Sequence, residues 1–475
     1  MKKYGVIFIV LIGILTGLTA AANGIAITAG LIGVICFASV LLVDYERATY
    51  ILAAYALVDF LMRTFGGNFA SIWDELLLIA MICLWMYKLF TERKTAAIKQ
   101  TPLDMPVIFF IAVMLFMLII NSPDYRISLE GFRATIQYML WYFAALQLMK
   151  NKKSARNVCN ALVLMGAAMA LHGVYQYIIG AEMPAGWIDQ NENSVRTRVY
   201  SILTSPNIMG SFMTLCIPIT VSLGIYETEN RKKRYLYFFF ALMMCASLIF
   251  TFSRGAWMGF AVAVGVYIFM KDKRLIIPAI IAAVLVIFLV PSVGNRITYM
   301  LSDEYIESSM KGGRLIRWLQ GMQLLKETDP VMGVGLGHFG GAVAMNNNTQ
   351  SYIGREIVRT FYMDNYYLKT AVETGIIGLL SFVILMYQTI ISSVRTIAKA
   401  EEKGYREIEI GILAGLCGIM CHNLVENIFE VPMMASCFWL MAAVMMHLWY
   451  EQRQEIKPKT VKKTIKTVKE ETLTT

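Results

Sequence analysis

Long runs of apolar residues, separated by short polar segments, fill most of this chain. Most runs are about 17–25 residues long, the length of helix that crosses a hydrocarbon core of roughly 30 Å. A transmembrane β-barrel would instead show shorter segments in which apolar and polar residues alternate. The pattern predicts an all-α, polytopic membrane protein with about fourteen spans, or twelve to fourteen because two runs are short. The predicted spans lie near residues 4–20, 24–43, 48–63, 72–90, 105–121, 132–149, 157–179, 207–225, 235–252, 255–270, 275–291, 365–391, 408–428 and 432–449.

One long polar stretch interrupts this pattern and divides the chain. Residues 1–291 are predicted to form the N-terminal transmembrane helices, 292–364 one large loop, and 365–450 the C-terminal transmembrane helices. Residues 451–475 are basic and rich in Lys, Thr and Glu, which predicts a disordered tail that contacts anionic lipid. The first run, which ends at Leu18, is interpreted as an uncleaved span rather than a cleaved signal peptide, because many spans follow.

Composition and charge support the membrane interpretation and orient the chain. Hydrophobic residues make up 57% of the 475 residues and charged residues only 16%, against about 25% in soluble proteins. With the N-terminus placed in the cytoplasm, the inside segments hold 29 of the 43 Lys and Arg residues, as the positive-inside rule requires. Both termini are therefore predicted to be cytoplasmic and the 292–364 loop extracytoplasmic.

The type of basic residue also differs between the two sides. The inside segments carry 20 Lys and 9 Arg, whereas the outside segments carry 11 Arg and 3 Lys. Topology needs only positive charge, but the planar guanidinium of Arg binds phosphate through two hydrogen bonds and stays charged when partly buried. The bias predicts an anionic substrate on the outer face. The eight cysteines and four histidines form no zinc signature, so neither a metal nor a cofactor is predicted, and no nucleic acid is expected as a partner.

Three motifs on the predicted outer face carry candidate chemistry. The first joins Arg198 to Ser205-Pro206-Asn207, which has the form of a helix start with Ser205 as the N-cap. Helix N-termini favour anions, although a capped turn alone would explain the same residues. The second motif is the short turn Ser253-Arg254-Gly255. An arginine between two apolar runs is usually functional, but it can also reach the lipid headgroups.

The third motif is the large loop itself. It holds a predicted amphipathic helix that begins near Arg314 and Arg317 and continues to Lys326. Next come three alternating glycines and His338, and we interpret the glycines as tight turns rather than as a nucleotide fingerprint. The loop ends with polar and aromatic residues that continue into the next span: Asp364, Asn365, Tyr366 and Glu373.

In this order, the motifs resemble those of the O-antigen ligase and O-antigen polymerase family, over roughly residues 190–430. The resemblance implies an all-helical, GT-C-like membrane glycosyltransferase that uses no metal. It implies a donor glycan carried on undecaprenyl pyrophosphate and a glycan or lipid acceptor. It further implies that Arg198 and Arg254 clamp the pyrophosphate, with Arg314 and Arg317 assisting. The remaining expected contacts to the substrate come from Asn207, Ser253, His338, Asn365, Tyr366 and Glu373.

The chain departs from the family pattern at one position. Many ligases have histidine before the loop-end asparagine, whereas this chain has Asp364. A carboxylate can accept a proton from a sugar hydroxyl or orient it, but it cannot act as a cation. We therefore predict that Asp364 activates the acceptor. His338 is one alternative, and His422 with Glu426, one helical turn apart, is a second candidate pair whose simpler explanation is a polar contact between spans.

The sequence thus predicts an enzyme that polymerises or ligates lipid-linked glycan, with inversion at the anomeric carbon. The alternative is a transporter or flippase of the same lipid-linked glycan. Transporters of that kind are commonly built from internal repeats with charges near the bilayer midplane. The sequence shows no repeat, and its arginines gather on one face.

Overall fold

A computed structural model describes residues 44–92, 98–183, 197–203, 205–311, 313–353, 356–359 and 361–473. The predicted spans near 4–20 and 24–43 lie outside these residues. In chain order the elements are α3 (Arg47–Ala53), α4 (Tyr55–Phe65), η1 (Gly67–Ser71), α5 (Trp73–Thr91), α6 (Asp104–Ile120), α7 (Tyr125–Leu148), α8 (Lys152–Ile179), α9 (Pro206–Tyr226), α10 (Arg231–Phe250), α11 (Arg254–Lys271), η3 (Lys273–Leu275), α12 (Ile276–Leu289), α13 (Pro291–Met300), α14 (Asp303–Met310), α15 (Arg314–Glu327), α16 (Ala342–Asn346), β1 (Gln350–Ile353), β2 (Glu356–Arg359), α17 (Tyr366–Lys399), α18 (Lys403–His422), η4 (Ile428–Glu430) and α19 (Pro432–Leu473).

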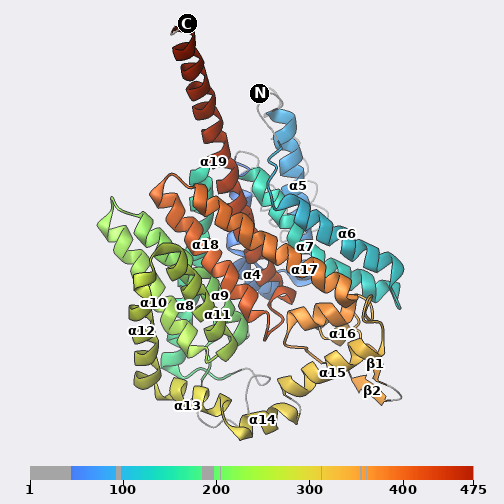
Figure 1. The fold of residues 1–475 in the computed structure, drawn as a ribbon. Coiled ribbons are helices and arrows are strands. Elements are labelled where there is room, and N and C mark those ends of the chain that lie inside the picture. Colours follow the sequence, from blue (N-terminus) through green and yellow to red (C-terminus); the bar gives the residue numbers. More distant parts are fainter. Residues whose placement is uncertain are drawn as a thin grey trace, which may run out of the picture.

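The structure is a bundle of long helices, which confirms the all-α prediction (Figure 1). In the described residues, five helices are long and apolar enough to cross a membrane, or seven if each of two bent helix pairs counts as one span. This supports a multi-pass membrane protein but not a count of fourteen. Some apolar runs do not form one straight helix long enough to cross a membrane. Helices α3 and α4 meet at 77°, and α6 is an apolar helix of only 17 residues. The only β-structure in the described part is the antiparallel β1–β2 hairpin.

The centre of the bundle is formed by α9, α18 and α19. The apolar windows of α9 and α19 are 83% and 89% buried inside the protein, so these helices face other helices rather than lipid. Three glycines on one face of α18 allow close packing, because a Cβ at Gly411 or Gly415 would lie 2.7 Å from a backbone oxygen of α9, and one at Gly418 would lie 2.9 Å from an oxygen of α11. This stripe holds α9 and α11 side by side on α18.

The predicted large loop folds into a layer at one end of the bundle. Figure 1 shows α13, α14, α15 and the β hairpin below the long helices, at the end opposite the C-terminus. The layer begins where α12 and α13 meet at 97°. In the described residues, α12 has no buried residue, which is the exposure expected of a helix that faces lipid. Helices thus bring Arg314 and the residues around it under the ends of α9 and α11.

A break in α17 anchors the glycine-rich part of this layer. Gly375 has φ 63° and ψ −167°, a conformation that only glycine adopts readily. Around the break, Val334 N donates to Val372 O and Gly335 N donates to Glu373 O, each at 2.9 Å. The glycine-rich segment therefore completes the hydrogen bonding of an interrupted helix, which agrees with its interpretation as turns rather than a nucleotide fingerprint.

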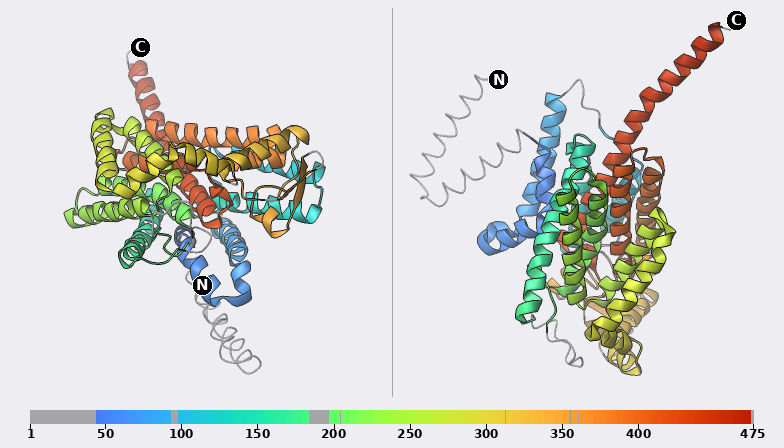
Figure 2. Two further views of the ribbon diagram at one scale, coloured as in Figure 1. Left: turned by 90° about the horizontal axis from the view of Figure 1, so that it is seen from below. Right: turned by 90° about the vertical axis from the view of Figure 1, so that its left-hand side faces the viewer.

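Residues 451–473, for which a disordered tail was predicted, continue α19, and the disorder itself stays a prediction. Figure 2 shows α19 leaving the bundle as a projecting helix, and its backbone stays helical to Leu473. The tail is rich in Lys and Glu, which have high helix propensity, so low hydrophobicity does not prevent a helix here.

The two ends of the bundle differ in which basic residue is more frequent. Lysines pair with carboxylates at the end where α19 leaves the bundle: Lys152 with Glu402 and Glu455, and Lys271 with Glu407. Arginines are more frequent at the opposite end, where Lys311 and Lys369 are also paired. This difference agrees with the predicted orientation, which itself stays a prediction.

Cysteine labelling of intact cells tests that orientation. In a background without the native cysteines, Met345→Cys should react with a membrane-impermeant maleimide because Met345 lies in the outer layer and is 37% exposed. Thr460→Cys, on the predicted cytoplasmic extension of α19, should react only after the cells are permeabilised. Protection at 345 together with labelling at 460 would invert the topology and remove every assignment to the outer face.

Candidate functional site

A pocket of about 220 Å³ lies between the ends of α9 and α11 and the layer formed by α13, α14 and α15. Four of its side chains are arginines, and no acidic side chain is among the described residues that line it. The pocket therefore concentrates positive charge where an anion can enter. Its lining residues are Arg198, Asn207, Phe252, Ser253, Arg254, Gly255, Arg296, Tyr299, Tyr305, Ser308, Ser309, Gly313 and Arg314.

Three helix N-termini border this pocket. Helix α9 begins after the N-cap Ser205, whose Oγ accepts from Ile208 N at 3.4 Å, which confirms the predicted helix start. Helix α11 begins after Ser253, whose Oγ accepts from Ala256 N at 3.4 Å. Helix α15 begins after Gly313, which has no side-chain cap. Free N–H groups and the helix dipole make such ends favourable for anions, so the backbone adds to the arginine charge.

Arg254 is the arginine best placed to receive a ligand. Its guanidinium lies over the ring of Tyr305, 4.9 Å from the centroid, and 5.8 Å from the centroid of Tyr299. The two rings hold the cation without neutralising it. Its Nη1 is buried and has no hydrogen-bond partner among the described residues. A buried donor left unpaired costs about 1–3 kcal/mol, so this atom favours binding of an anion in the pocket.

Arg198 and Arg296 fix the turn that carries Arg254. Arg198 Nε donates to Thr251 O at 3.0 Å, and Arg296, which is only 5% exposed, donates through Nη1 to Phe252 O. Phe252 has φ 49°, an uncommon value for a residue other than glycine. Two guanidiniums thus hold the carbonyl groups of a strained turn, and this contact places Ser253 and Arg254 at the pocket.

A chain of alternating charges runs along one side of the pocket. Arg317 Nη1 lies 2.8 Å from Asp364 Oδ2, and the same oxygen lies 3.6 Å from Arg314 Nε. Arg314 Nη2 lies 3.3 Å from Glu426 Oε2, which accepts from Asn207 Nδ2 at 2.6 Å. Arg198 Nη2 in turn donates to Asn207 Oδ1 at 3.0 Å. The network joins α15, the end of the large loop, the α18–α19 connection and α9.

Glu426 is the carboxylate of this network that suits proton transfer. It follows the end of α18 at His422, so it lies in a connecting loop and not in a helical span. Burial raises the pKa of its carboxyl group, and so does the nearby charge of Asp364, while Arg314 opposes both; the result is a pKa of about 7. A carboxyl group with a pKa near neutrality can both accept and release a proton.

The proposed pairing of His422 with Glu426 is not found. His422 is fully buried, and its Nδ1 lies 2.5 Å from Ser211 Oγ on α9. Because α18 ends at His422, the two residues are not on successive turns of one helix, and Glu426 contacts Asn207 and Arg314 instead. The polar contact between helices, which was the simpler explanation for His422, is what the structure contains.

Four of the predicted substrate contacts lie neither in the pocket lining nor in the charged network beside it. His338 Nδ1 lies 2.8 Å from Leu336 O within the glycine-rich turn, and Asn365 caps α17 by accepting from Leu368 N at 3.0 Å. Tyr366 is 4% exposed and packs against Phe382 and Phe429.

Glu373 is 3% exposed and pairs with Lys369 at 2.6 Å. Lys369 also contacts Glu430 at 3.1 Å, which ties α17 to the α18–α19 connection. Glu373 therefore braces the layer from inside. The i,i+4 spacing of Lys369 and Glu373 in α17 was a signal in the sequence that could have identified Glu373 as a partner in an ion pair.

Several residues of the pocket were not identified from the sequence. Arg296 falls within the predicted 292–364 loop without a predicted role, and nothing in the pattern indicated Tyr299 or Tyr305. These residues reach Arg254 only because α12 and α13 meet at 97° and turn the chain back under α11. Contacts of this kind depend on tertiary structure.

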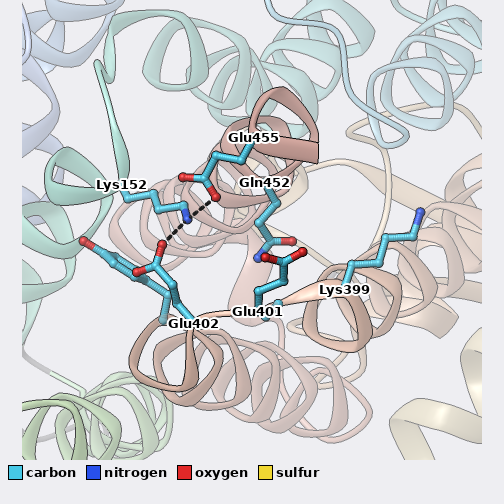
Figure 3. A pocket seen from close by; sticks show the side chains of 8 residues that line it. Lys152, Lys399, Glu401, Glu402, Gln452 and Glu455 are labelled. Carbon is cyan, nitrogen blue, oxygen red and sulfur yellow. Dashed lines mark hydrogen bonds and ion pairs between the residues drawn. The ribbon is translucent and has the colours of Figure 1, made fainter. Parts of the chain in front are cut away.

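Other charged clusters do not compete with this pocket. Figure 3 shows a cavity at the opposite end of the bundle, where Lys152 contacts Glu402 at 2.5 Å and Glu455 at 2.8 Å. Its volume of about 10 Å³ is close to the space that one water needs, and its lysine is already paired. In the part of the chain that the structure describes, no group of three or more His, Cys, Asp or Glu side chains is arranged to hold a metal ion.

A family model described as O-antigen ligase matches residues 238–383, which include Arg254, Arg296, Arg314, Arg317 and Asp364. No individual curated protein matches the chain significantly. The family includes proteins that ligate or polymerise surface polysaccharide, as the order of motifs predicted. Residues 238–383 of the chain are therefore similar to the O-antigen ligase family.

Proposed function

We propose that this protein transfers glycan from undecaprenyl pyrophosphate to a glycan or lipid acceptor on the outer face of the cytoplasmic membrane. The observation that carries the proposal is the buried, unpartnered Nη1 of Arg254 in a pocket that holds four arginines. The volume of about 220 Å³ suits a small polyanionic group. A pyrophosphate has the charge and the acceptor oxygens that such a pocket lacks.

In this proposal the arginines stabilise the leaving group. Arg254 binds the pyrophosphate directly, and Arg198, Arg296 and Arg314 supply a fixed positive field that costs no reorganisation during the reaction. The N-terminal N–H groups of α9, α11 and α15 face the same anion. Fixed cations then take the role that a metal ion has in some other transferases.

The acceptor side is assigned to the two carboxylates beside Arg314. Asp364 Oδ2 is held by two arginines, while its Oδ1 accepts no hydrogen bond from the described residues. We assign Oδ1 the task of orienting the acceptor hydroxyl. Glu426, whose pKa is about 7, takes the proton. The sequence-based prediction gave both tasks to Asp364. We move proton transfer to Glu426 because its pKa lies near neutrality and it is partly buried beside Arg314 and Asn207.

In this proposal the reaction is a single displacement at the anomeric carbon. The acceptor oxygen bonds to the anomeric carbon as the bond from that carbon to the pyrophosphate oxygen breaks. Its proton passes to Glu426, and the electron pair leaves with undecaprenyl pyrophosphate. Attack opposite the leaving group inverts the anomeric configuration. The position of the pocket at one end of the bundle also supports an enzyme over a transporter, which commonly binds its substrate near the midplane.

Purified protein in nanodiscs tests the function. The donor is the lipid-linked glycan extracted from cells that lack this gene, and the measurements are release of undecaprenyl pyrophosphate and growth of the acceptor. Wild type should produce both in parallel. If the protein moves the donor across vesicle membranes without releasing undecaprenyl pyrophosphate, the flippase alternative replaces the proposal.

A further inference from the structure

A second, larger hollow lies on the other side of α15 from the arginine pocket. This chain groove, as we call it, has a volume of about 730 Å³, within the range of about 300–1,000 Å³ typical of ligand sites. It runs along α15 and is bounded by the segment that leads to Asp364. Its lining residues are Met310, Lys311, Ile316, Arg317, Gln320, Met345, Phe361 and Tyr362.

The groove and the pocket are connected through charged side chains. Arg317 lines the groove and pairs with Asp364 at 2.8 Å, and Asp364 reaches Arg314, which lines the pocket. Asp364 therefore lies between the two hollows. A molecule that extends along the groove ends beside the carboxylate that we assign to the acceptor hydroxyl.

The walls of the groove are held in place before any ligand binds. Arg317 Nη1 donates to Tyr362 O at 3.2 Å, and Trp318 Nε1 donates to Met363 O at 3.1 Å, so the 361–364 segment is fixed along α15. Phe361 packs edge to face on Phe339, with ring centroids 5.5 Å apart. Tyr362, in contrast, keeps 43% of its surface exposed. A fixed segment that presents an open aromatic ring reduces the entropy lost on binding.

The chemistry of the lining fits sugar rings better than acyl chains. A pyranose has an apolar C–H face that can lie against an aromatic ring, and a rim of hydroxyls that need hydrogen-bond partners. Tyr362 and Phe361 offer rings, while Gln320, Arg317 and Lys311 offer donors. No acidic side chain lines the groove among the described residues, so it accepts neutral and acidic sugars alike. An acyl chain would offer these polar side chains no hydrogen-bond acceptor.

We propose that the chain groove binds the sugar residues of a polysaccharide acceptor, with Tyr362 as the stacking ring. This inference rests on the proposed function and adds to it the class of acceptor. It also predicts that affinity for the acceptor rises with the number of sugars until the groove is filled.

Acceptor kinetics test the inference on the full chain in nanodiscs. The probe is the free glycan released by mild acid from the lipid-linked donor, sorted by length, with labelled donor held constant. Tyr362→Ala should raise the KM for the acceptor about ten-fold, as expected for loss of one aromatic contact, and leave kcat nearly unchanged. Tyr362→Phe keeps the ring and should behave like wild type. Tyr235→Ala, at an exposed tyrosine on α10, is the matched control.

Release of undecaprenyl pyrophosphate without acceptor, by transfer to water, gives an independent readout. It should be equal in wild type and Tyr362→Ala, because the change does not touch the arginine pocket. If Tyr362→Ala transfers glycan with the wild-type KM, the groove does not hold the acceptor, although the proposed function stands. If wild type releases no undecaprenyl pyrophosphate under any condition, the proposed function itself fails.

Discussion

Replacing Arg254 by alanine is expected to lower the rate of glycan transfer by about 10²–10³-fold, the usual cost of losing one fixed group that stabilises developing charge. Stability should not fall with it. Because Nη1 of Arg254 is buried and has no partner among the residues that the structure describes, its removal relieves a desolvation cost, so the variant should insert normally and melt at or slightly above the wild-type temperature. Activity and the melting temperature, measured on the same purified samples, check both parts.

Two further variants test whether a guanidinium is needed at position 254 and control for the loss of an outer arginine elsewhere. Arg254→Lys should recover little activity, because an ammonium lacks the planar pair of donors that binds phosphate in a bidentate way. Arg126→Ala should keep full activity: this outer arginine is 86% exposed and pairs only with Glu130, at 3.8 Å. If lysine at position 254 restores the wild-type rate, Arg254 serves topology or lipid contact and not the pyrophosphate.

Replacing Glu426 by glutamine is expected to lower transfer by about 10²–10⁴-fold, the range for a lost general base. The pH profile carries more information than the rate. A base acts in its ionised form, so the wild-type rate should rise with pH through about 7 and then level off. Glu426→Gln should lose this acid limb and remain uniformly slow between pH 5.5 and 8.5. Rates at saturating donor and acceptor provide the measurement.

Asp364→Asn distinguishes the role of Asp364 from that of Glu426. It removes the partner of Arg314 and Arg317 and weakens the orientation of the acceptor, so the rate should fall, but the acid limb should remain. If Asp364→Asn abolishes the limb while Glu426→Gln keeps it, the two roles are exchanged. If both variants match the wild-type rate, neither carboxylate takes part in proton transfer.

The sequence predicted those parts of the site that depend on local pattern. Ser205 and Ser253 precede helices, and the amphipathic segment from Arg314 forms a helix to Glu327, one residue beyond the predicted Lys326. Such features follow from capping and periodicity, which act over a few residues. The excess of arginine on one face likewise indicated an anion site before any geometry was known.

The remaining parts depend on long-range packing. Glu426 lies 219 residues after Asn207, and only the glycine stripe of α18 brings α9 and the α18–α19 connection close enough for their contact at 2.6 Å. The predicted count of fourteen spans is not confirmed, for a related reason. Apolar runs indicate that a segment is hydrophobic, but not whether its helix bends, as α3 and α4 do at 77°.

The convergence of three helix ends on the pocket sets a limit on what mutagenesis can remove. Each helix N-terminus acts as roughly +0.5 of an elementary charge, so α9, α11 and α15 together present about one and a half charges that belong to the main chain. No side-chain substitution deletes them. A variant that lacks all four guanidiniums of the pocket would still face the substrate with this backbone field, and its residual rate would measure how much catalysis the fold supplies without its arginines.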